Sequence, residues 1–236
     1  MAQLLETVPD KVLAIYAHPD DPDVSCGGTL ARFARQGAEV HVVLCTNGDK
    51  GTTDPTVDPG QLARRRAAEC AEAATHLGLS DQHVLGYRDG ELTDDESFRG
   101  ELVGWIRRLR PGMVLCPDPT AVFFGEDYFN HRDHRIVGFA VLDALSPAAA
   151  LPLYFPDAGA VHQVETVLLS GTLEPTLWVD ISATIDEKAA AVSCHRSQFA
   201  DDGEWAASAV RTRAAADGRR AGVPFAEGFR RLRLSV

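Results

Sequence analysis

Short apolar runs alternate with longer segments of helical periodicity along the first half of the chain. The apolar runs have strand length and little internal polarity, which is typical of strands covered on both faces of a parallel sheet. The predicted strands are residues 12–17, 40–45, 83–85 and 113–116, and the predicted helices are residues 25–36, 61–77 and 98–109. This alternation predicts an α/β fold with a doubly wound, mostly parallel sheet and right-handed crossovers.

The second half of the chain has a looser pattern. Helices are expected at residues 136–145, 183–197 and 205–216, and strands at residues 164–169 and 178–181, followed by an irregular tail. The chain shows no internal repeat, low-complexity segment or linker. A single domain over residues 1–236 is therefore the expectation for a chain of this length.

Charge argues against a polyanionic partner. The formal net charge is −11, whereas nucleic acids and anionic membranes attract clustered basic residues. Residues 64–66 and 230–233 are the densest basic clusters, and each is interpreted as a solvated helix face. We therefore expect neither nucleic acid nor a membrane as the main partner.

The five cysteines are scattered and form no C-x-x-C pair, which favours reduced thiols in small core positions. The N-terminus lacks the basic flank and apolar core of a signal peptide, and no apolar run is long enough to span a bilayer. These observations predict a cytoplasmic protein. A homo-oligomer is compatible with the sequence.

Polar residues with metal-binding chemistry follow two of the predicted strands. Ala17-His18-Pro19-Asp20-Asp21 comes directly after the first strand, and His131-Arg132-Asp133-His134 follows the fourth strand and its loop. Ligands of open parallel sheets bind beyond the carboxyl ends of the strands. The two clusters are therefore expected to meet at that edge of the sheet.

Three of these side chains make a plausible ligand set. Pro19 stiffens the loop that carries His18 and Asp21, and His134 lies on the helix that Asn130 is expected to cap. Two imidazoles and one carboxylate are a common set for catalytic zinc, with a fourth position left for water. The same ligands would also accept Fe²⁺.

The neighbouring residues suit hydrolysis of an amide or ester. Asp20 is placed as a general base beside a metal-activated water, and His131 as a proton donor or oxyanion stabiliser. Asp133 is expected in a capping-box position and as the partner that orients an imidazole. Taken singly, each residue could instead be a turn former or surface group.

Core or surface positions are expected for the other histidines, which are His41, His76, His83, His162 and His195.

These motifs resemble the PIG-L/LmbE-like family of zinc-dependent N-acetylglucosaminyl deacetylases. The resemblance rests on AHPDD, C-G-G-T-L-A-R, L-C-T-N-G-D-K-G, R-x-x-E, L-G-Y-R-D-G-E-L and H-R-D-H, and covers residues 12 to about 198. It implies a Rossmann-like fold, a metal held by His18, Asp21 and His134, and catalysis by Asp20 and His131.

The resemblance also implies that Arg66 and Asp89 contact the sugar or its substituent. Where the family usually has Glu after the second Asp, this chain has Pro22-Asp23. Some relatives have a mobile Tyr shortly before the H-x-D-H motif, and both Tyr128 and Phe129 stand close to that position.

Three alternatives remain open at this stage. An amidase acting on a thiol conjugate would use the same site. A non-haem Fe²⁺ oxygenase could use His18, His131 and Asp133 as its triad, although such triads usually sit on antiparallel strands. A non-catalytic binding domain would contain no stoichiometric metal. The favoured function is metal-dependent deacetylation of a small N-acylated amino sugar.

Overall fold

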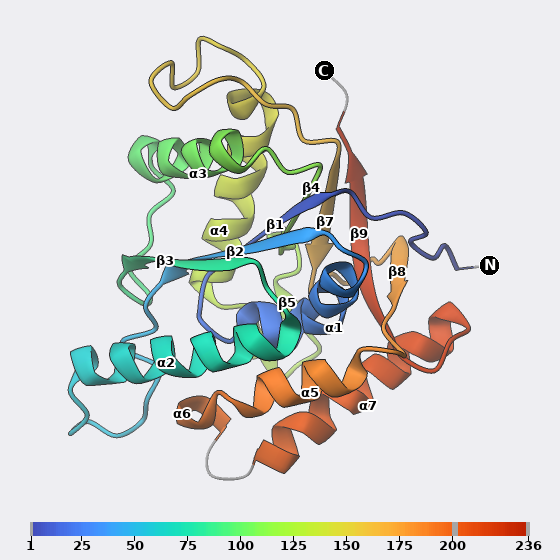
Figure 1. The fold of residues 1–236 in the computed structure, drawn as a ribbon. Coiled ribbons are helices and arrows are strands. Elements are labelled where there is room, and N and C mark those ends of the chain that lie inside the picture. The colour runs from blue at the N-terminus through green and yellow to red at the C-terminus, as the bar shows by residue number, and fades with distance from the viewer. Residues whose placement is uncertain (1, 200–202, 235–236) are drawn as a thin grey trace.

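A seven-stranded sheet forms the centre of the molecule in the computed structural model, which describes residues 2–199 and 203–234 (Figure 1). Its strand order is β3-β2-β1-β4-β7-β9-β8. The strands are β1 (Lys11–Tyr16), β2 (Glu39–Thr46), β3 (Asp81–Tyr87), β4 (Met113–Pro117), β7 (Thr166–Ser170), β8 (Leu177–Asp180) and β9 (Ala226–Arg233). Pairing from β3 through β7 is parallel, while β9 is antiparallel to both of its neighbours. The predicted Rossmann-like, mostly parallel fold is confirmed.

Helices cover both faces of the sheet, as Figure 1 shows. The helices are α1 (Asp21–Arg35), α2 (Pro59–Leu77), α3 (Glu96–Leu109), α4 (Arg132–Asp143), the π-helical turn η1 (Ala144–Ala149), α5 (Ile185–Ser193), α6 (Arg196–Phe199) and α7 (Gly203–Ala221). One core contains side chains of α1, α2, α5 and α7, and the other contains side chains of α3, α4 and η1.

The continuous apolarity of β1 follows from this two-sided burial. Val12, Ala14 and Tyr16 belong to the core on one face of the sheet. Leu13 and Ile15 belong to the core on the other face. Because successive side chains of a strand alternate between faces, a central strand between two helical layers needs apolar residues at every position.

The C-terminal tail differs from the prediction. It forms β9, which pairs with β7 and β8, so the expectation of an irregular tail is wrong. Residues 230–233 lie in this strand and are not a helix face. Apolar and polar residues alternate only weakly along β9. Its antiparallel insertion between β7 and β8 also leaves no local pattern in the sequence.

Element boundaries also differ at several places. Helix α1 begins at Asp21, four residues earlier than predicted, and bends at Cys26, where the backbone leaves helical geometry. The segment predicted as one helix over 183–197 is divided into α5 and α6. A small hairpin of β5 (Phe123–Phe124) and β6 (Tyr128–Phe129) was not predicted. Within the described residues, no helix is long and apolar enough to cross a membrane.

Candidate metal centre

The two histidine-aspartate clusters meet at the carboxyl edge of the sheet, where strand order reverses. The chain passes from β1 to β2 on one side, and β4 pairs with β1 on the other. His18 follows β1, and α4 carries His134 in its first turn. This position is the usual ligand site of an open α/β sheet.

Three donor groups converge there at short distances. His18 Nδ1 lies 3.1 Å from His134 Nε2 and 3.2 Å from Asp21 Oδ2. His134 Nε2 lies 3.0 Å from Asp21 Oδ1. A tetrahedral zinc site with bonds of about 2.0–2.1 Å places neighbouring ligand atoms about 3.3 Å apart. The three groups therefore have the spacing that a metal requires.

Hydrogen bonds on the outer side of each ring support this assignment. His134 Nδ1 donates to Asn130 Oδ1 at 2.8 Å, which leaves Nε2 as a bare nitrogen. His18 Nε2 faces Asp89 Oδ1 at 3.2 Å and Asp133 Oδ2 at 3.7 Å, which leaves Nδ1 bare. Two imidazole nitrogens and a carboxylate that face one another form a donor set that fits a divalent metal.

The ionisation of these groups agrees with a site built for positive charge. Burial disfavours the charged form of His18, but the Asp21 carboxylate and hydrogen bonds with Asp133 raise its pKa well above the ordinary value. Burial favours protonated Asp21, yet His134 and His18 lower its pKa well below the usual range. The pocket thus holds a carboxylate ionised beside two imidazoles.

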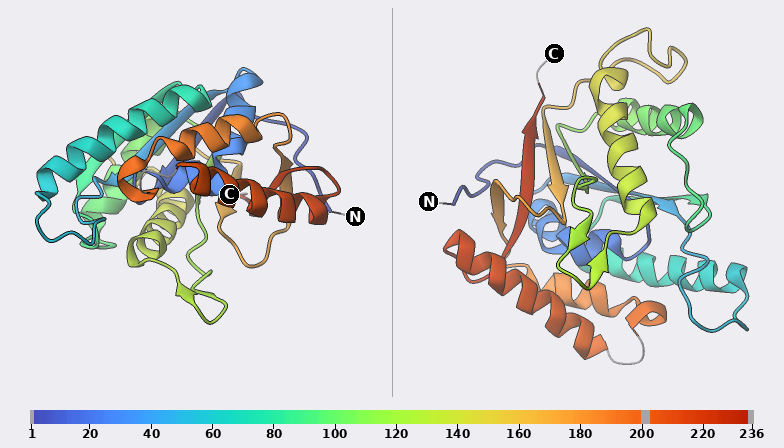
Figure 2. Two further views of the ribbon diagram at one scale, coloured as in Figure 1. Left: turned by 90° about the horizontal axis from the view of Figure 1, so that it is seen from below. Right: turned by 180° about the vertical axis from the view of Figure 1, so that it is seen from behind.

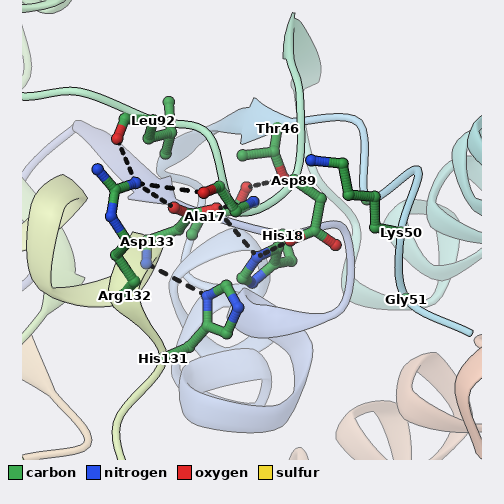
Figure 3. A network of polar contacts seen from close by, with 12 residues as sticks. Ala17, His18, Thr46, Lys50, Gly51, Asp89, Leu92, His131, Arg132 and Asp133 are labelled. Atoms are coloured by element: carbon green, nitrogen blue, oxygen red, sulfur yellow. Dashed lines mark hydrogen bonds and ion pairs between the residues drawn. The ribbon is translucent and has the colours of Figure 1, made fainter.

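A network behind His18 fixes its orientation (Figure 3). Asp133 is completely buried, and its Oδ2 accepts the backbone N–H of Gly90 at 2.7 Å. Asp49 Oδ1 accepts the backbone N–H of Asp89 at 3.0 Å and so holds the loop after β3. Carboxylate partners of this kind set the tautomer of a metal-binding histidine. Asp49 was missed by the sequence analysis, although it lies within the T-N-G-D-K-G segment.

Helix α4 begins differently from the prediction. His131, and not Asn130, is the N-cap, and its Nδ1 accepts the N–H of Asp133 at 3.2 Å. Because Asn130 is not the N-cap, its Oδ1 can accept the hydrogen bond from His134 Nδ1. Burial and the neighbouring His18 lower the pKa of His131, so its neutral ring carries the proton on Nε2.

Asp20 lies beside the three donors and is held by a buried arginine. Arg66 Nη2 donates to Asp20 Oδ1 at 2.8 Å, and Arg66 Nη1 donates to the carbonyl of Gly48 at 3.1 Å. Only 3% of Arg66 is exposed, so the interpretation of residues 64–66 as a solvated helix face is wrong for Arg66. The guanidinium instead orients the carboxylate next to the metal centre.

A second donor set lies close by. Ligand atoms of His18, Asp89, His131 and Asp133 lie within 4.8 Å of one another, and this set contains the oxygenase triad considered above. Two of its members are already engaged, because His131 Nδ1 caps α4 and Asp133 Oδ2 accepts a backbone N–H. In the set of His18, Asp21 and His134, Asp21 Oδ2 accepts the backbone N–H of His18 at 2.7 Å, while Asp21 Oδ1 faces His134 Nε2 at 3.0 Å. This set also lines the cavity through Asp21 and His134, and we take it as the candidate metal centre.

A cavity of about 400 Å³ opens beside the metal centre. Asp20, Asp21 and His134 form one wall of it, and Tyr128 lines the rim while Phe129 does not. Pro22 stands in the first turn of α1 and does not line the cavity. Arg66 and Asp89 are buried and do not line this cavity. The contact with substrate that the resemblance implies for them stays a prediction.

The remaining histidines and cysteines agree with structural roles. His195 is completely buried and bonds Asp23 at 2.5 Å. Asp23, which follows Pro22 in the segment that departs from the usual family pattern, therefore anchors the first turn of α1. All five cysteines are free and buried, as expected for core thiols.

The fold and site define a Rossmann-like α/β protein with a candidate metal centre at the switch point of its sheet. Residues 13–145 match the family model described as PIG-L, GlcNAc-PI de-N-acetylase. The chain belongs to this family.

Two similar proteins of known name are deacetylases. A diacetylchitobiose deacetylase of Thermococcus kodakarensis is 39% identical over 93% of this chain and 82% of its own length. A 1D-myo-inositol 2-acetamido-2-deoxy-alpha-D-glucopyranoside deacetylase of Saccharopolyspora erythraea is 31% identical over 84% of this chain and 88% of its own. The predicted family and reaction class, hydrolytic deacetylation, are confirmed at this level.

Solved structures show the same fold. The N,N'-diacetylchitobiose deacetylase of Pyrococcus horikoshii superimposes with a TM-score of 0.86 at 33% identity, covering 95% of this chain and 84% of its own. A 4-carboxy-2-hydroxymuconate hydratase of Pseudomonas putida reaches 0.79 at only 22% identity, over 97% of this chain and 98% of its own. Because a hydratase shares the fold, the reaction must be argued from the site.

Proposed function

We propose that this chain is a zinc-dependent deacetylase of a small N-acetylated amino sugar. The observation that carries the proposal is the convergence of His18, Asp21 and His134 at 3.0–3.2 Å beside the carboxylate of Asp20. Deacetylase relatives at 39% and 31% identity support the choice of an acetyl group on an amino sugar.

His18, Asp21 and His134 would hold the divalent cation. When bound, the cation supplies Lewis-acid activation of a water and of the amide carbonyl. Fe²⁺ fits the same ligands as Zn²⁺ does. A metal analysis of protein purified without added metal distinguishes the two ions.

Asp20 acts as the general base in this proposal. Its carboxylate lines the cavity and removes the proton from the attacking water. Arg66 fixes the orientation of Asp20 by its 2.8 Å hydrogen bond, so the acceptor oxygen stays in place through the reaction. The same carboxyl group, once protonated, can return a proton to the departing amine.

His131 stabilises the developing oxyanion. Its Nδ1 accepts the N–H of Asp133, so Nε2 carries the proton of the neutral ring and can donate a hydrogen bond. A preorganised donor of this kind typically contributes about 10²–10³-fold to turnover. Asp133 and Asp89 hold His18 from behind. The contact of Asp89 with the sugar remains a prediction from the family resemblance.

The partner of the proposed reaction is a small molecule. The sequence argues against nucleic acid through its net charge of −11. Five buried, unpaired thiols support a reducing, cytoplasmic setting.

A combined metal analysis and acetate-release screen tests this function. The purified chain is offered N-acetylglucosamine, N,N'-diacetylchitobiose, N-acetylglucosaminyl inositol and an N-acetylated thiol conjugate. We expect about one metal per chain and acetate release from at least one sugar. Release from the thiol conjugate alone would favour the amidase alternative. Absence of both metal and acetate would favour a binding domain and overturn the proposal.

A further inference from the structure

A second group of metal-binding side chains lies where helix α2 meets the end of α5. Glu72 and His76 come from α2, and Cys194 is the C-cap residue of α5. Figure 2 shows the orange α5 and α6 lying beside the blue-green α2. The ligand atoms of these three side chains lie within 4.8 Å of one another. None of them lines the cavity beside the candidate metal centre, so the two groups are separate.

The two residues of α2 share one face of the helix. Glu72 and His76 are four residues apart, a spacing that places side chains next to each other on a helix. Both side chains are exposed, so they can rotate toward a cation between them. The ring of His76 makes no hydrogen bond within residues 2–199 and 203–234. An imidazole nitrogen with its lone pair is therefore available beside a carboxylate.

Cys194 adds a sulfur ligand to this pair. Only 3% of Cys194 is exposed, and its thiol faces the Glu72 carboxylate. Burial and then the negative charge of Glu72 raise the pKa of the thiol to about 11, so the free protein holds it protonated. A divalent cation that binds the sulfur releases this proton to solvent. The resulting thiolate, imidazole and carboxylate are the ligand types that Zn²⁺ takes in proteins, and the thiolate selects against Mg²⁺ and Ca²⁺.

Arg196 competes with a cation for the carboxylate of this group. Its Nη1 and Nη2 donate to the two oxygens of Glu72 at 3.0 and 2.9 Å. The two side chains are 54% and 44% exposed, and ion pairs of this kind contribute little to stability. A cation can therefore displace the guanidinium, but its binding must overcome both the ion pair and the thiol proton. The group accordingly binds a cation more weakly than the candidate metal centre does, and it fills when the cation is in excess.

We propose that Glu72, His76 and Cys194 form a second cation site, which binds a thiophilic divalent ion such as Zn²⁺. Its three ligands leave a fourth tetrahedral position for water. The bound ion joins α2 to the end of α5 by coordinate bonds, in place of the ion pair that joins α2 to Arg196. The site shares no ligand with the candidate metal centre, so it does not depend on the proposed function.

A cobalt titration followed by absorption tests this site. Thiolate bound to Co²⁺ gives a charge-transfer band in the near ultraviolet, which nitrogen and oxygen ligands do not give. The candidate metal centre contains no sulfur, so it does not contribute to this band. We expect the band to appear when Co²⁺ is added to the purified, reduced protein and to saturate at about one ion per chain. The titration needs no substrate, so a chain that deacetylates no sugar can still confirm the site.

Variants of the ligands separate coordinated from adventitious cobalt. Cys194→Ser should abolish the band, and His76→Ala should weaken cobalt binding at least about tenfold. His83→Ala is the matched control, because the ring of His83 on β3 pairs with Asp81 and lies outside the group. Its cobalt affinity should equal that of the unmodified protein. Arg196→Ala removes the competing guanidinium and should strengthen cobalt binding about two- to fivefold.

Two results of the titration would overturn the proposal. One is the absence of the near-ultraviolet band at excess cobalt, or a band that persists in Cys194→Ser. The other is an equal midpoint in His76→Ala and in the unmodified protein, since Cys194 would then bind the ion without the imidazole. The link between the helices has its own measurement: excess Zn²⁺ should raise the Tm of the unmodified protein and leave that of Cys194→Ser unchanged. Equal shifts in the two proteins, or no shift in either, would contradict the link.

Discussion

Asp20 and its neighbours show how adjacent residues acquire different roles. Asp21 faces His134 Nε2 at 3.0 Å, whereas Asp20 faces the guanidinium of Arg66 at 2.8 Å. The turn into α1 separates the two carboxylates, so one is a candidate ligand and the other is left as a candidate base. Their division of roles depends on Arg66, which comes from a different helix.

Replacing Asp20 tests the proposed base. Asp20→Asn removes the proton acceptor while keeping the size of the side chain, so we expect kcat to fall about 10²–10⁴-fold. Metal content should stay at that of the unmodified protein, because Asp20 is not among the proposed ligands. Acetate release and elemental analysis are the measurements. Asp186→Asn, at an exposed position on α5, serves as the control. Full activity in Asp20→Asn would rule out this base.

Arg66 is expected to act through Asp20. Arg66→Lys keeps the charge but cannot reach both Asp20 and the carbonyl of Gly48 with a planar fork. We expect kcat to fall about tenfold or more, because a misplaced base loses proton-transfer efficiency. KM for the acetylated sugar should change little if Arg66 only positions Asp20. A large rise in KM with unchanged kcat would instead indicate the direct sugar contact that the family resemblance implies. Arg64→Lys is the exposed control on the same helix.

Much of the site could be predicted at the residue scale, because its parts are contiguous in sequence. His18, Asp20 and Asp21 share one short loop, and the segment containing His131 and His134 shares one helix start. Asp49 could not be found in this way. Its contribution is a hydrogen bond to the backbone of Asp89, and backbone donors leave no trace in residue identity.

At the scale of elements, α1 is the helix that positions the ligand loop, and a buried ion pair stabilises its bend. The helix leaves regular geometry at Cys26, which frees backbone donors in the next turn. Glu227 on β9 accepts the N–H groups of Gly28 and Thr29 at 3.1 and 2.8 Å. Lys188 on α5 neutralises Glu227 at 2.5 Å and also donates to Val24. Helix α1, helix α5 and strand β9 therefore meet at the bend of α1.

Breaking this pair should destabilise the fold. Lys188→Met leaves the buried carboxylate of Glu227 without its cation, so we expect the free energy of unfolding to fall by about 3–5 kcal/mol. Chemical denaturation followed by circular dichroism measures the change. The double variant Lys188→Met/Glu227→Gln removes both charges and should recover part of the loss. A single variant as stable as the unmodified chain would show that the pair contributes nothing.

Element prediction succeeded where periodicity is strong and failed where elements are short or non-local. Strands β1, β2 and β4 are buried on both faces of the sheet. Their uninterrupted apolar residues reveal this burial directly in the sequence. The two-residue strands β5 and β6 are too short for any period to be recognised. Phe124 of β5 and Tyr128 of β6 nevertheless line the cavity.

At the scale of the whole molecule, the order of strands creates the site. The chain adds β2 and β3 on one side of β1 and then returns to place β4 on the other side, and this reversal of strand order opens the carboxyl edge where both clusters meet. The β–α alternation was enough to predict this edge. The insertion of β9 between β7 and β8 could not be predicted. Helices α5, α6 and α7 separate β9 from β8 along the chain, so no local sequence pattern marks this pairing. Glu227, which lies on β9, shows that this strand also supports α1.

Metal removal tests the central claim most directly. Acetate release from the best sugar substrate is measured before chelation, after exhaustive chelation and dialysis, and after addition of one equivalent of Zn²⁺ or Fe²⁺. We predict that chelation abolishes activity while circular dichroism stays unchanged, and that one of the two ions restores it. His134→Ala should resist restoration, since it lacks one of three ligands. Undiminished acetate release from chelated, metal-free protein would contradict the account.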